Sequence, residues 1–211
     1  MNNKLHIITG YTENIKQLSD LSYDSLQKYC NLHNINHTRY LITETERPPS
    51  WYKVKLILSE FEKGAEYVMW VDSDTTVINF DFNILDLLDD SKIYLSKDIN
   101  GINCGIMIWK KSDTSIEILN KVWSLTEFIN HNWWEQASFR SLYDANFNDL
   151  QNITKIINQH DLNSYDYNLY GMHYPEGQWS ASSFLIHFPG LSNERRIQLI
   201  NQFKEQYDIS N

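Results

Sequence analysis

The chain has 211 residues, of which 42% are hydrophobic and 14% aromatic, which is enough to bury a sizeable core and too apolar for a disordered chain. A formal net charge of −9 argues against a general nucleic-acid surface, because binding to phosphate backbones needs a basic stripe and none is visible in the sequence. Seven tryptophans leave aromatic surface to spare for contact with carbohydrate, although we expect most aromatic side chains in the core.

The composition shows no domain boundary, so we predict a single domain over residues 1–211. Cys30 and Cys104 are too few for a disulfide scaffold and lack metal-type spacing, which favours a reducing compartment. The sequence contains no apolar signal segment and no span of about 20 apolar residues. We therefore expect no membrane segment, and either a cytoplasmic protein of bacterial or viral origin or a soluble domain of a longer protein.

The amino-terminal part of the chain predicts a βα unit. Residues 5–9 indicate a strand, and Gly10 and Tyr11 indicate a turn. Thr12 is placed to cap a helix that continues towards Leu32.

Hydrophobic patterning predicts that strands and helices alternate early in the chain and that the pattern changes later. The further elements expected are a strand at 38–42, a helix at 51–61, strands at 67–71, 92–96 and 105–109, helices at 112–130 and 133–143, strands at 153–157 and 184–187, and a helix at 192–207. The early alternation predicts an α/β fold with a parallel, doubly wound, Rossmann-like sheet.

Two aspartates follow the densest apolar run, which is the predicted strand at 67–71. Asp72 and Asp74 are separated by Ser73, so both carboxylates project from one side of the strand end. They would repel each other without a cation, and with one they become hard oxygen ligands for Mg²⁺ or Mn²⁺. The competing interpretation is an ordinary turn, in which Asp and Ser are common.

His187 ends the predicted late strand, far along the chain from the two aspartates. A single histidine at such a position is usually structural. The alternative is that its neutral imidazole supplies a further ligand to the cation held by Asp72 and Asp74. Two carboxylates and one imidazole suit Mn²⁺ better than Mg²⁺, which prefers oxygen ligands.

Other polar residues have both a functional and a structural interpretation. Asn103 and the preceding Asp98 either form a turn or lie where a ligand approaches the backbone. Glu135 and Gln136, behind two tryptophans, either complement a helix dipole or face a sugar. Lys53 is either a solvated lysine or a cation that reaches a diphosphate.

Together these motifs resemble those of metal-dependent glycosyltransferases of the GT-A fold. The resemblance is nearest to the α-galactosyl, α-xylosyl and mannan-elongating mannosyl transferases, with glycogenin-like enzymes next, and it spans residues 5–195. The motifs that carry it are, in order, Trp51-x-Lys53, the strand ending in Asp72-Ser73-Asp74, Asn103-x-Gly105, Trp134-Glu135-Gln136 and His187-Phe188-x-Gly190. It implies a mixed central sheet, with a nucleotide-binding part at about 1–78 and a sugar- and acceptor-binding part at about 79–211.

The resemblance also implies roles for individual residues. Those implied to bind the metal are Asp72, Asp74 and His187; those implied to bind the donor are Thr9, Gly10, Tyr11, Lys53, Asp72, Ser73, Asp74, Asn103, Gly190 and Arg195; those implied to be catalytic are Glu135, Gln136 and Asp98. One departure concerns the basic residue that relatives carry shortly after the histidine. This chain has Ser192 and Asn193 there, so Arg195 or Arg196 has to take that role.

The implied activity is Mn²⁺-dependent transfer of a hexosyl residue, such as galactosyl, glucosyl or mannosyl, with Mg²⁺ as a second possible metal. The implied donor is a nucleotide sugar, UDP-linked rather than GDP-linked, and the acceptor is a glycan, glycoprotein or glycolipid. Retention of the anomeric configuration is favoured by the resemblance alone. An inverting route would need a carboxylate base, for which Glu135 and Asp98 are the candidates.

Two other functions remain open from the sequence. A haloacid-dehalogenase-type, Mg²⁺-dependent phosphohydrolase would use Asp72 as nucleophile and Asp74 as acid/base, although that signature normally ends the first strand of its fold. A carbohydrate-binding module would use the tryptophans and a structural ion, but such modules are commonly all-β.

Overall fold

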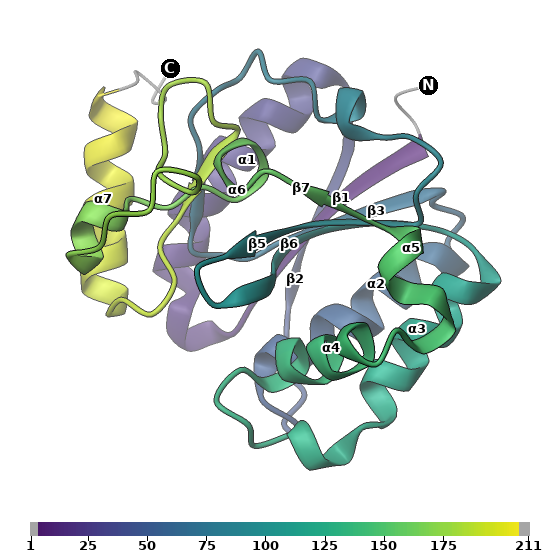
Figure 1. Ribbon diagram of the computed structural model, residues 1–211. Coiled ribbons are helices and arrows are strands. Elements are labelled where there is room, and N and C mark those ends of the chain that lie inside the picture. The colour runs from purple at the N-terminus through teal and green to yellow at the C-terminus, as the bar shows by residue number, and fades with distance from the viewer. Residues whose placement is uncertain (1–3, 207–211) are drawn as a thin grey trace.

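A mixed sheet of six strands in the order β2-β1-β3-β6-β5-β7 forms the centre of the computed structural model, which describes residues 4–206 (Figure 1). The strands are β1 Leu5–Tyr11, β2 Asn36–Leu41, β3 Tyr67–Val71, β5 Ile93–Asp98, β6 Gly101–Lys110 and β7 Thr154–Ile157. β1 pairs in parallel with β2 and β3, and β5 pairs in parallel with β7. β6 runs antiparallel to β3 and β5, so the sheet is mixed, as the resemblance implied.

Helices cover both faces of the sheet. α2, α3 and α4 lie on one face, α1 and α6 lie on the other, and α7 packs beside α1 (Figure 1). The α-helices are α1 Lys16–His33, α2 Tyr52–Glu62, α3 Asp113–Ser124, α4 Trp134–Asp144, α5 Leu150–Ile153, α6 Gln159–Leu162 and α7 Asn193–Gln206. Short 3₁₀ turns occur at Glu13–Ile15, Pro49–Trp51, Ile84–Leu87, Thr126–Phe128, Phe147–Asp149 and Tyr167–Tyr170. Between residues 4 and 206, no helix has the length and apolar character needed to cross a membrane.

Strand β3 is buried on both faces, as its unbroken apolar sequence predicts. Val68 and Trp70 pack into the core formed with α2, α3 and α4. Met69 and Val71 point the other way, into the core that contains the apolar residues of α1. This double burial fixes the position of β3 and therefore the position of the aspartates that follow it.

A second, two-stranded sheet brings the late part of the chain to the end of β3. β4, Thr75–Val77, pairs antiparallel with β8, Leu185–His187, and Thr75 lies opposite His187. β4 was not expected from the sequence, because three residues with two threonines carry little hydrophobic pattern. It positions His187 beside the aspartate pair.

The first strand is longer than the sequence indicated. Gly10 and Tyr11 lie within β1, opposite Tyr40 and Leu41 of β2, so the expected turn at these residues is wrong. A side chain at Gly10 would lie 2.9 Å from atoms of Ile42 and Trp70, which explains the glycine at this crowded point. The expected Thr12 cap is also absent, because a 3₁₀ turn at Glu13–Ile15 precedes α1 and Thr12 makes no side-chain capping bond.

Three other boundaries differ from expectation. The helix expected at 112–130 ends at Ser124, because Leu125 leaves the helical region with φ −79° and ψ 78°. The strand expected at 105–109 begins at Gly101, because β6 pairs with β5 from the hairpin onward. The last helix begins at Asn193 rather than 192, and Tyr207 lies outside the described residues.

We expect both cysteines to be unreactive in the folded protein. Cys30 in α1 and Cys104 in β6 are at most 1% exposed, and burial raises the pKa of the Cys30 thiol to about 12. Because the thiolate is the reactive form, an aromatic disulfide reagent at pH 8 should titrate neither thiol in native protein and both after unfolding in guanidinium. Rapid reaction of either thiol without unfolding would contradict the packing described here.

Candidate active site

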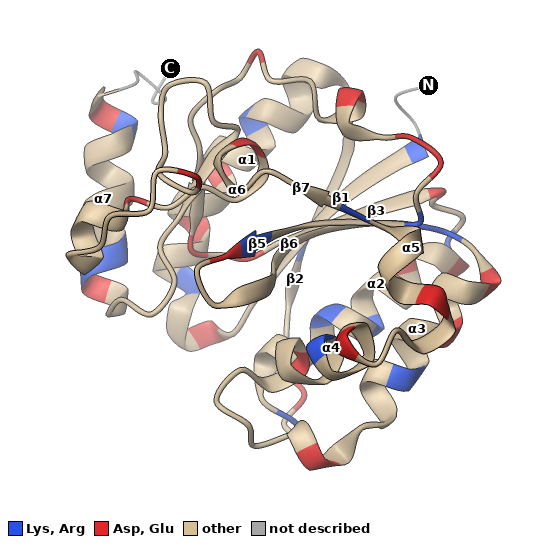
Figure 2. Ribbon diagram, viewed as in Figure 1, with Lys and Arg blue, Asp and Glu red and all other residues tan. Residues whose placement is uncertain are grey.

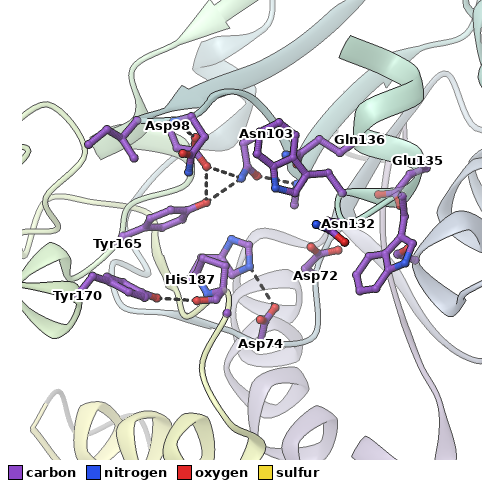
Figure 3. Close-up of a pocket in the computed structure, with 18 of the residues that line it drawn as sticks. Asp72, Asp74, Asp98, Asn103, Asn132, Glu135, Gln136, Tyr165, Tyr170 and His187 are labelled. Carbon is purple, nitrogen blue, oxygen red and sulfur yellow. Dashed lines mark hydrogen bonds and ion pairs between the residues drawn. The ribbon is translucent and has the colours of Figure 1, made fainter. Parts of the chain in front are cut away.

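A cavity of about 530 Å³ opens where the carboxyl ends of β3 and β5, the amino end of β6 and the end of β8 meet. Ligands bind preferentially at this edge of open α/β sheets. The lining combines acidic and amide side chains with aromatic rings (Figure 3). Its volume suits a ligand of the size of a small organic molecule.

Asp72, Asp74 and His187 form a compact cluster in this cavity. Each offers one possible ligand atom, and these atoms all lie within 4.8 Å of one another. The backbone N–H of Asp72 donates to the carbonyl of Gly105 at 2.9 Å, and the carbonyl of Asp74 accepts from the N–H of Phe188 at 3.0 Å. These bonds tie the turn between β3 and β4 to β6 and β8.

The Asp74 carboxylate lies between two basic side chains. Its Oδ1 is 3.1 Å from His187 Nε2 (Figure 3). Its Oδ2 is 3.1 Å from Arg196 Nη2. Burial alone would raise the pKa of Asp74, but His187 and Arg196 outweigh burial and hold that pKa well below its usual range. Asp74 is therefore ionised throughout the physiological pH range.

The donor set fits a divalent cation. Two carboxylates and an imidazole nitrogen are a mixed oxygen and nitrogen set, which suits Mn²⁺, and Asp72 is 30% exposed towards the cavity at its side chain. The two carboxylates repel each other, and Lys53, His187 and Arg196 offset part of that repulsion in the absence of a cation.

A buried lysine holds two carboxylates at the floor of the cavity. Lys53 Nζ lies 3.2 Å from Asp72 Oδ1, 2.8 Å from Glu135 Oε1 and 3.0 Å from the carbonyl oxygen of Cys104. Burial would lower the pKa of Lys53, but Asp72 and Glu135 outweigh burial and raise it. The indole Nε1 of Trp70 also donates to Asp72 Oδ1 at 2.6 Å, so this side of Asp72 is fixed.

Polar groups on β5 and β6 form a second network in the same cavity. Asn103 Nδ2 donates to Asp98 Oδ2 at 2.9 Å and to the Tyr165 hydroxyl oxygen at 2.7 Å (Figure 3). Gln136 Oε1 accepts from the backbone N–H of Cys104 at 2.9 Å. Burial raises the pKa of Tyr165 well above its usual value, so its hydroxyl keeps the proton that it donates to Asp98.

Comparison with known proteins identifies similar folds and a family match over part of the chain. The model of the galactosyl transferase GMA12/MNN10 family matches residues 7–93. A glycosyltransferase involved in the glycosylation of the major capsid of PBCV-1 superposes with a TM-score of 0.74 and 18% identity, over 94% of this chain and 98% of that chain. The chain is a glycosyltransferase of the GT-A fold.

Other solved glycosyltransferases share this fold. The galactosyltransferase LgtC, solved in complex with donor and acceptor sugar analogs, gives a TM-score of 0.62 at 12% identity over 93% of this chain and 95% of that chain. GlyE of Streptococcus pneumoniae TIGR4 gives 0.59 at 14% identity over 99% of this chain and 64% of that chain. No curated protein sequence matches the chain. The predicted GT-A fold and the predicted glycosyltransferase activity class are confirmed.

The glycosyltransferase brings together most of the residues that the sequence singled out. Those that line the cavity are Lys53, Asp72, Asp74, Asp98, Asn103, Glu135, Gln136, His187 and Gly190. Those that do not line it are Thr9, Gly10, Tyr11, Ser73 and Arg195. Thr9 and Gly10 are enclosed in β1, and Arg195 Nη1 bonds to Gln198 on the exposed side of α7, whereas the neighbouring Arg196 faces the cavity.

Several lining residues of the glycosyltransferase were not expected from the sequence. Tyr165, Tyr167 and Tyr170 come from a segment with little regular structure, where scattered tyrosines carry no pattern that separates a site from a core. The Tyr170 hydroxyl donates to the carbonyl of Pro189 at 2.9 Å and so holds the loop after His187. The only sequence signal for these tyrosines is that they lie in a polar segment between predicted elements, where binding residues are common.

The mouth of the cavity carries exposed apolar side chains. Exposed fractions are 40% for Trp133, 44% for Trp134, 48% for Ile99 and 47% for Met172, and all four residues line the cavity. Trp134 also has a φ of 43°, an unfavourable backbone conformation for a large L-residue. Backbone strain tends to occur at functional sites, and here it accompanies an exposed indole at the entrance of the cavity.

Proposed function

We propose that this glycosyltransferase transfers a hexosyl residue from a UDP-linked sugar to a hydroxyl group of a glycan, glycoprotein or glycolipid, with Mn²⁺ bound by Asp72, Asp74 and His187. The observation that carries this proposal is the cluster of these three side chains, with ligand atoms within 4.8 Å of one another, inside the cavity of about 530 Å³ of a glycosyltransferase fold. Part of the sequence, at about 1–78, would bind the nucleotide, and the part at about 79–211 would bind the sugar and the acceptor.

The chemical difficulty of the transfer is the negative charge that develops on the departing diphosphate. A divalent cation bound by the cluster would act as a Lewis acid on that diphosphate. Arg196 contributes a guanidinium group at the same place, because it lines the cavity beside Asp74. It would donate hydrogen bonds to the phosphate oxygens, which planar guanidinium groups bind well.

Lys53 is better suited to holding the site than to binding phosphate. Its ammonium group already contacts Asp72, Glu135 and the Cys104 carbonyl, and the side chain is 3% exposed. We propose that it fixes Asp72 in position for the metal and keeps Glu135 ionised and immobile. Basic residues elsewhere are spread over several elements and mixed with acidic ones (Figure 2), so the positive charge for an anionic donor has to come from such local groups.

The arrangement of carboxylates favours retention of the anomeric configuration. An inverting reaction needs a carboxylate that is free to take the proton of the acceptor hydroxyl. Glu135 is held in the buried ion pair with Lys53, and Asp98 accepts hydrogen bonds from Asn103 and Tyr165. Glu135 is thus fixed through its Oε1, whereas its Oε2 is buried without a hydrogen-bond partner among the described residues, and Asp98 is engaged as an acceptor. We propose that Asp98, Asn103 and Gln136 bind the transferred sugar.

The two other functions suggested by the sequence fit the structure less well. A phosphohydrolase nucleophile at Asp72 would have to be released from Trp70 and Lys53, which hold one of its oxygens. A carbohydrate-binding module of the all-β kind does not match a sheet covered by helices on both faces. Nothing in the site favours either function over sugar transfer.

Incubation with a panel of UDP- and GDP-sugars, with Mn²⁺ or with a chelator, tests the proposal. We expect Mn²⁺-dependent release of UDP from at least one UDP-hexose and none after chelation. A parallel assay with p-nitrophenyl phosphate measures phosphohydrolase activity. Phosphate release from that ester, with no reaction of any nucleotide sugar, would contradict sugar transfer and support the phosphohydrolase.

We expect Trp134→Ala to weaken acceptor use without changing donor binding. Loss of an indole that stacks on a sugar should raise the acceptor KM about tenfold, equivalent to about 1.4 kcal/mol, because aromatic rings contribute stacking and apolar contact. Ile156→Ala is the control, because Ile156 is exposed on β7 and does not line the cavity. An unchanged acceptor KM, or an equal loss of UDP affinity, would show that Trp134 does not bind the acceptor.

A further inference from the structure

Asn163 connects the candidate metal ligand His187 to the polar network at Asn103. Its side chain is fully buried, with 0% exposure, and it does not line the cavity. Asn163 Oδ1 lies 2.9 Å from His187 Nδ1, and Asn163 Nδ2 donates to Asn103 Oδ1 at 2.9 Å. The proposed reaction assigns no role to this residue.

The direction of the hydrogen bonds in this chain is determined at its other end. The backbone N–H of Gly105 can only donate, and it donates to Asn103 Oδ1 at 2.8 Å. The carboxylate of Asp98 accepts from Asn103 Nδ2 at 2.9 Å. These two partners fix which end of the Asn103 amide carries the oxygen. A flipped amide would place its oxygen against the Asp98 carboxylate and its NH₂ group against the Gly105 N–H, and neither pair can form a hydrogen bond.

The orientation of Asn103 then determines the proton position on His187. Since Asn103 Oδ1 accepts, Asn163 has to present its Nδ2 to Asn103 and its Oδ1 to His187. His187 Nδ1 therefore carries a proton, and a cation that takes the place of a proton on Nε2 meets the lone pair of that nitrogen. Nε2 is the nitrogen that faces Asp74, at 3.1 Å from its Oδ1.

Packing alone does not select this tautomer. A side chain at Gly105 would lie 2.5 Å from His187 Cε1, and the Tyr165 ring meets the imidazole edge-on with centroids 5.4 Å apart. These contacts restrict the plane of the imidazole ring but do not distinguish a protonated Nδ1 from a protonated Nε2. Among the described contacts of Nδ1, the hydrogen bond to Asn163 makes that distinction.

We propose that Asn163 is a positioning residue that holds His187 in the Nδ1–H tautomer, so that Nε2 is available to a divalent cation. This inference rests on the metal site of the proposed function. It fits the general behaviour of metal-bound histidines, whose second ring nitrogen usually donates to an oxygen that fixes the tautomer.

The proton on Nδ1 can be read directly in wild-type protein loaded with diamagnetic Zn²⁺. Two-bond ¹H–¹⁵N NMR spectra distinguish a protonated Nδ1 from a protonated Nε2. The His187→Gln variant identifies the signals of this ring. We expect the proton on Nδ1, and a proton on Nε2 would overturn the proposal without any Asn163 variant.

Two substitutions at Asn163 test the effect on the metal. Asn163→Leu removes the acceptor, and we expect Mn²⁺ alone, titrated by calorimetry, to bind 10- to 100-fold more weakly, with part of the ring population moving its proton to Nε2. Asn163→Asp keeps an oxygen opposite Nδ1 but places its second oxygen against Asn103 Oδ1, so we expect the Nδ1–H tautomer and a smaller loss of Mn²⁺ affinity than in Asn163→Leu.

Thr76→Val is the matched control. Thr76 is also fully buried and lies in β4, and the substitution removes one buried hydrogen bond, to Ser25. We expect its Mn²⁺ affinity to equal that of wild type. Wild-type affinity in Asn163→Leu, or equal weakening by the Leu and Asp substitutions, would overturn the positioning role. If wild-type protein binds no Mn²⁺, both the positioning role of Asn163 and the proposed metal site are wrong. If the protein binds Mn²⁺ but His187 carries its proton on Nε2, the positioning role alone is wrong.

Discussion

Asp74→Asn is expected to lower the rate of sugar transfer about 10³-fold, since a Lewis-acid contact to the leaving group is worth several kcal/mol and each 1.4 kcal/mol is about tenfold in rate. The substitution keeps the size of the side chain and removes the charge that faces His187 and Arg196. Initial rates of UDP release at saturating Mn²⁺ measure the effect.

Asp24→Asn is a suitable control for the loss of one acidic charge. Asp24 pairs with Lys204 at 2.9 Å, its side chain is 65% exposed, and it does not line the cavity. Surface ion pairs contribute little, so we expect its rate and its thermal midpoint to match those of wild type. A transfer rate in Asp74→Asn within tenfold of wild type would contradict the proposed role of Asp74.

Lys53→Met is expected to lower the free energy of unfolding by about 3–5 kcal/mol, because it leaves the buried Glu135 carboxylate without its charged partner. Lys53 and Glu135 are 3% and 4% exposed, and their charged atoms lie 2.8 Å apart. Urea denaturation followed by fluorescence of the tryptophans measures the change. The double variant Lys53→Met/Glu135→Gln removes both charges, and we expect it to recover much of the lost stability.

The defect in Lys53→Met should also depend on pH. Burial raises the pKa of Glu135 in the folded protein, and removal of the lysine takes away the opposing effect. A group whose folded pKa lies above its unfolded value favours the folded state at low pH and loses that contribution as pH rises through the folded pKa. The defect should therefore be smaller near pH 4.5 than near pH 7.5, and a defect of equal size at both would show that Glu135 is not the cause.

The sequence predicted a strand or helix well where its burial requires a regular run or periodicity of apolar residues. The apolar run at Tyr67–Val71 is a strand because both of its faces are buried, and its bounds agree with expectation. β4 has no such pattern, since its place depends on pairing with β8, which comes much later in the chain. Gly10 and Tyr11 likewise became strand residues through pairing with β2.

The acidic and histidine residues of the site could be predicted because their side chains carry the chemistry. Asp72, Asp74 and His187 were expected at one place, and the pairing of β4 with β8 puts them there. Tyr165 and Asn163 could not be predicted, because their roles arise from hydrogen bonds to partners far away in the sequence. For the same reason the sequence, which left Lys53 as either a solvated lysine or a cation that reaches a diphosphate, could not show that it is buried between Asp72 and Glu135.

Calorimetric titration of UDP and GDP into wild-type protein and the Asp74→Asn variant, with and without Mn²⁺, tests the central claim most directly. We predict that UDP binds wild type at least about tenfold more tightly with Mn²⁺, a difference of about 1.4 kcal/mol, and that the Asp74→Asn variant loses this gain. GDP should bind more weakly than UDP. Equal nucleotide affinity with and without Mn²⁺ in wild-type protein would contradict a metal-dependent donor site formed by Asp72, Asp74 and His187.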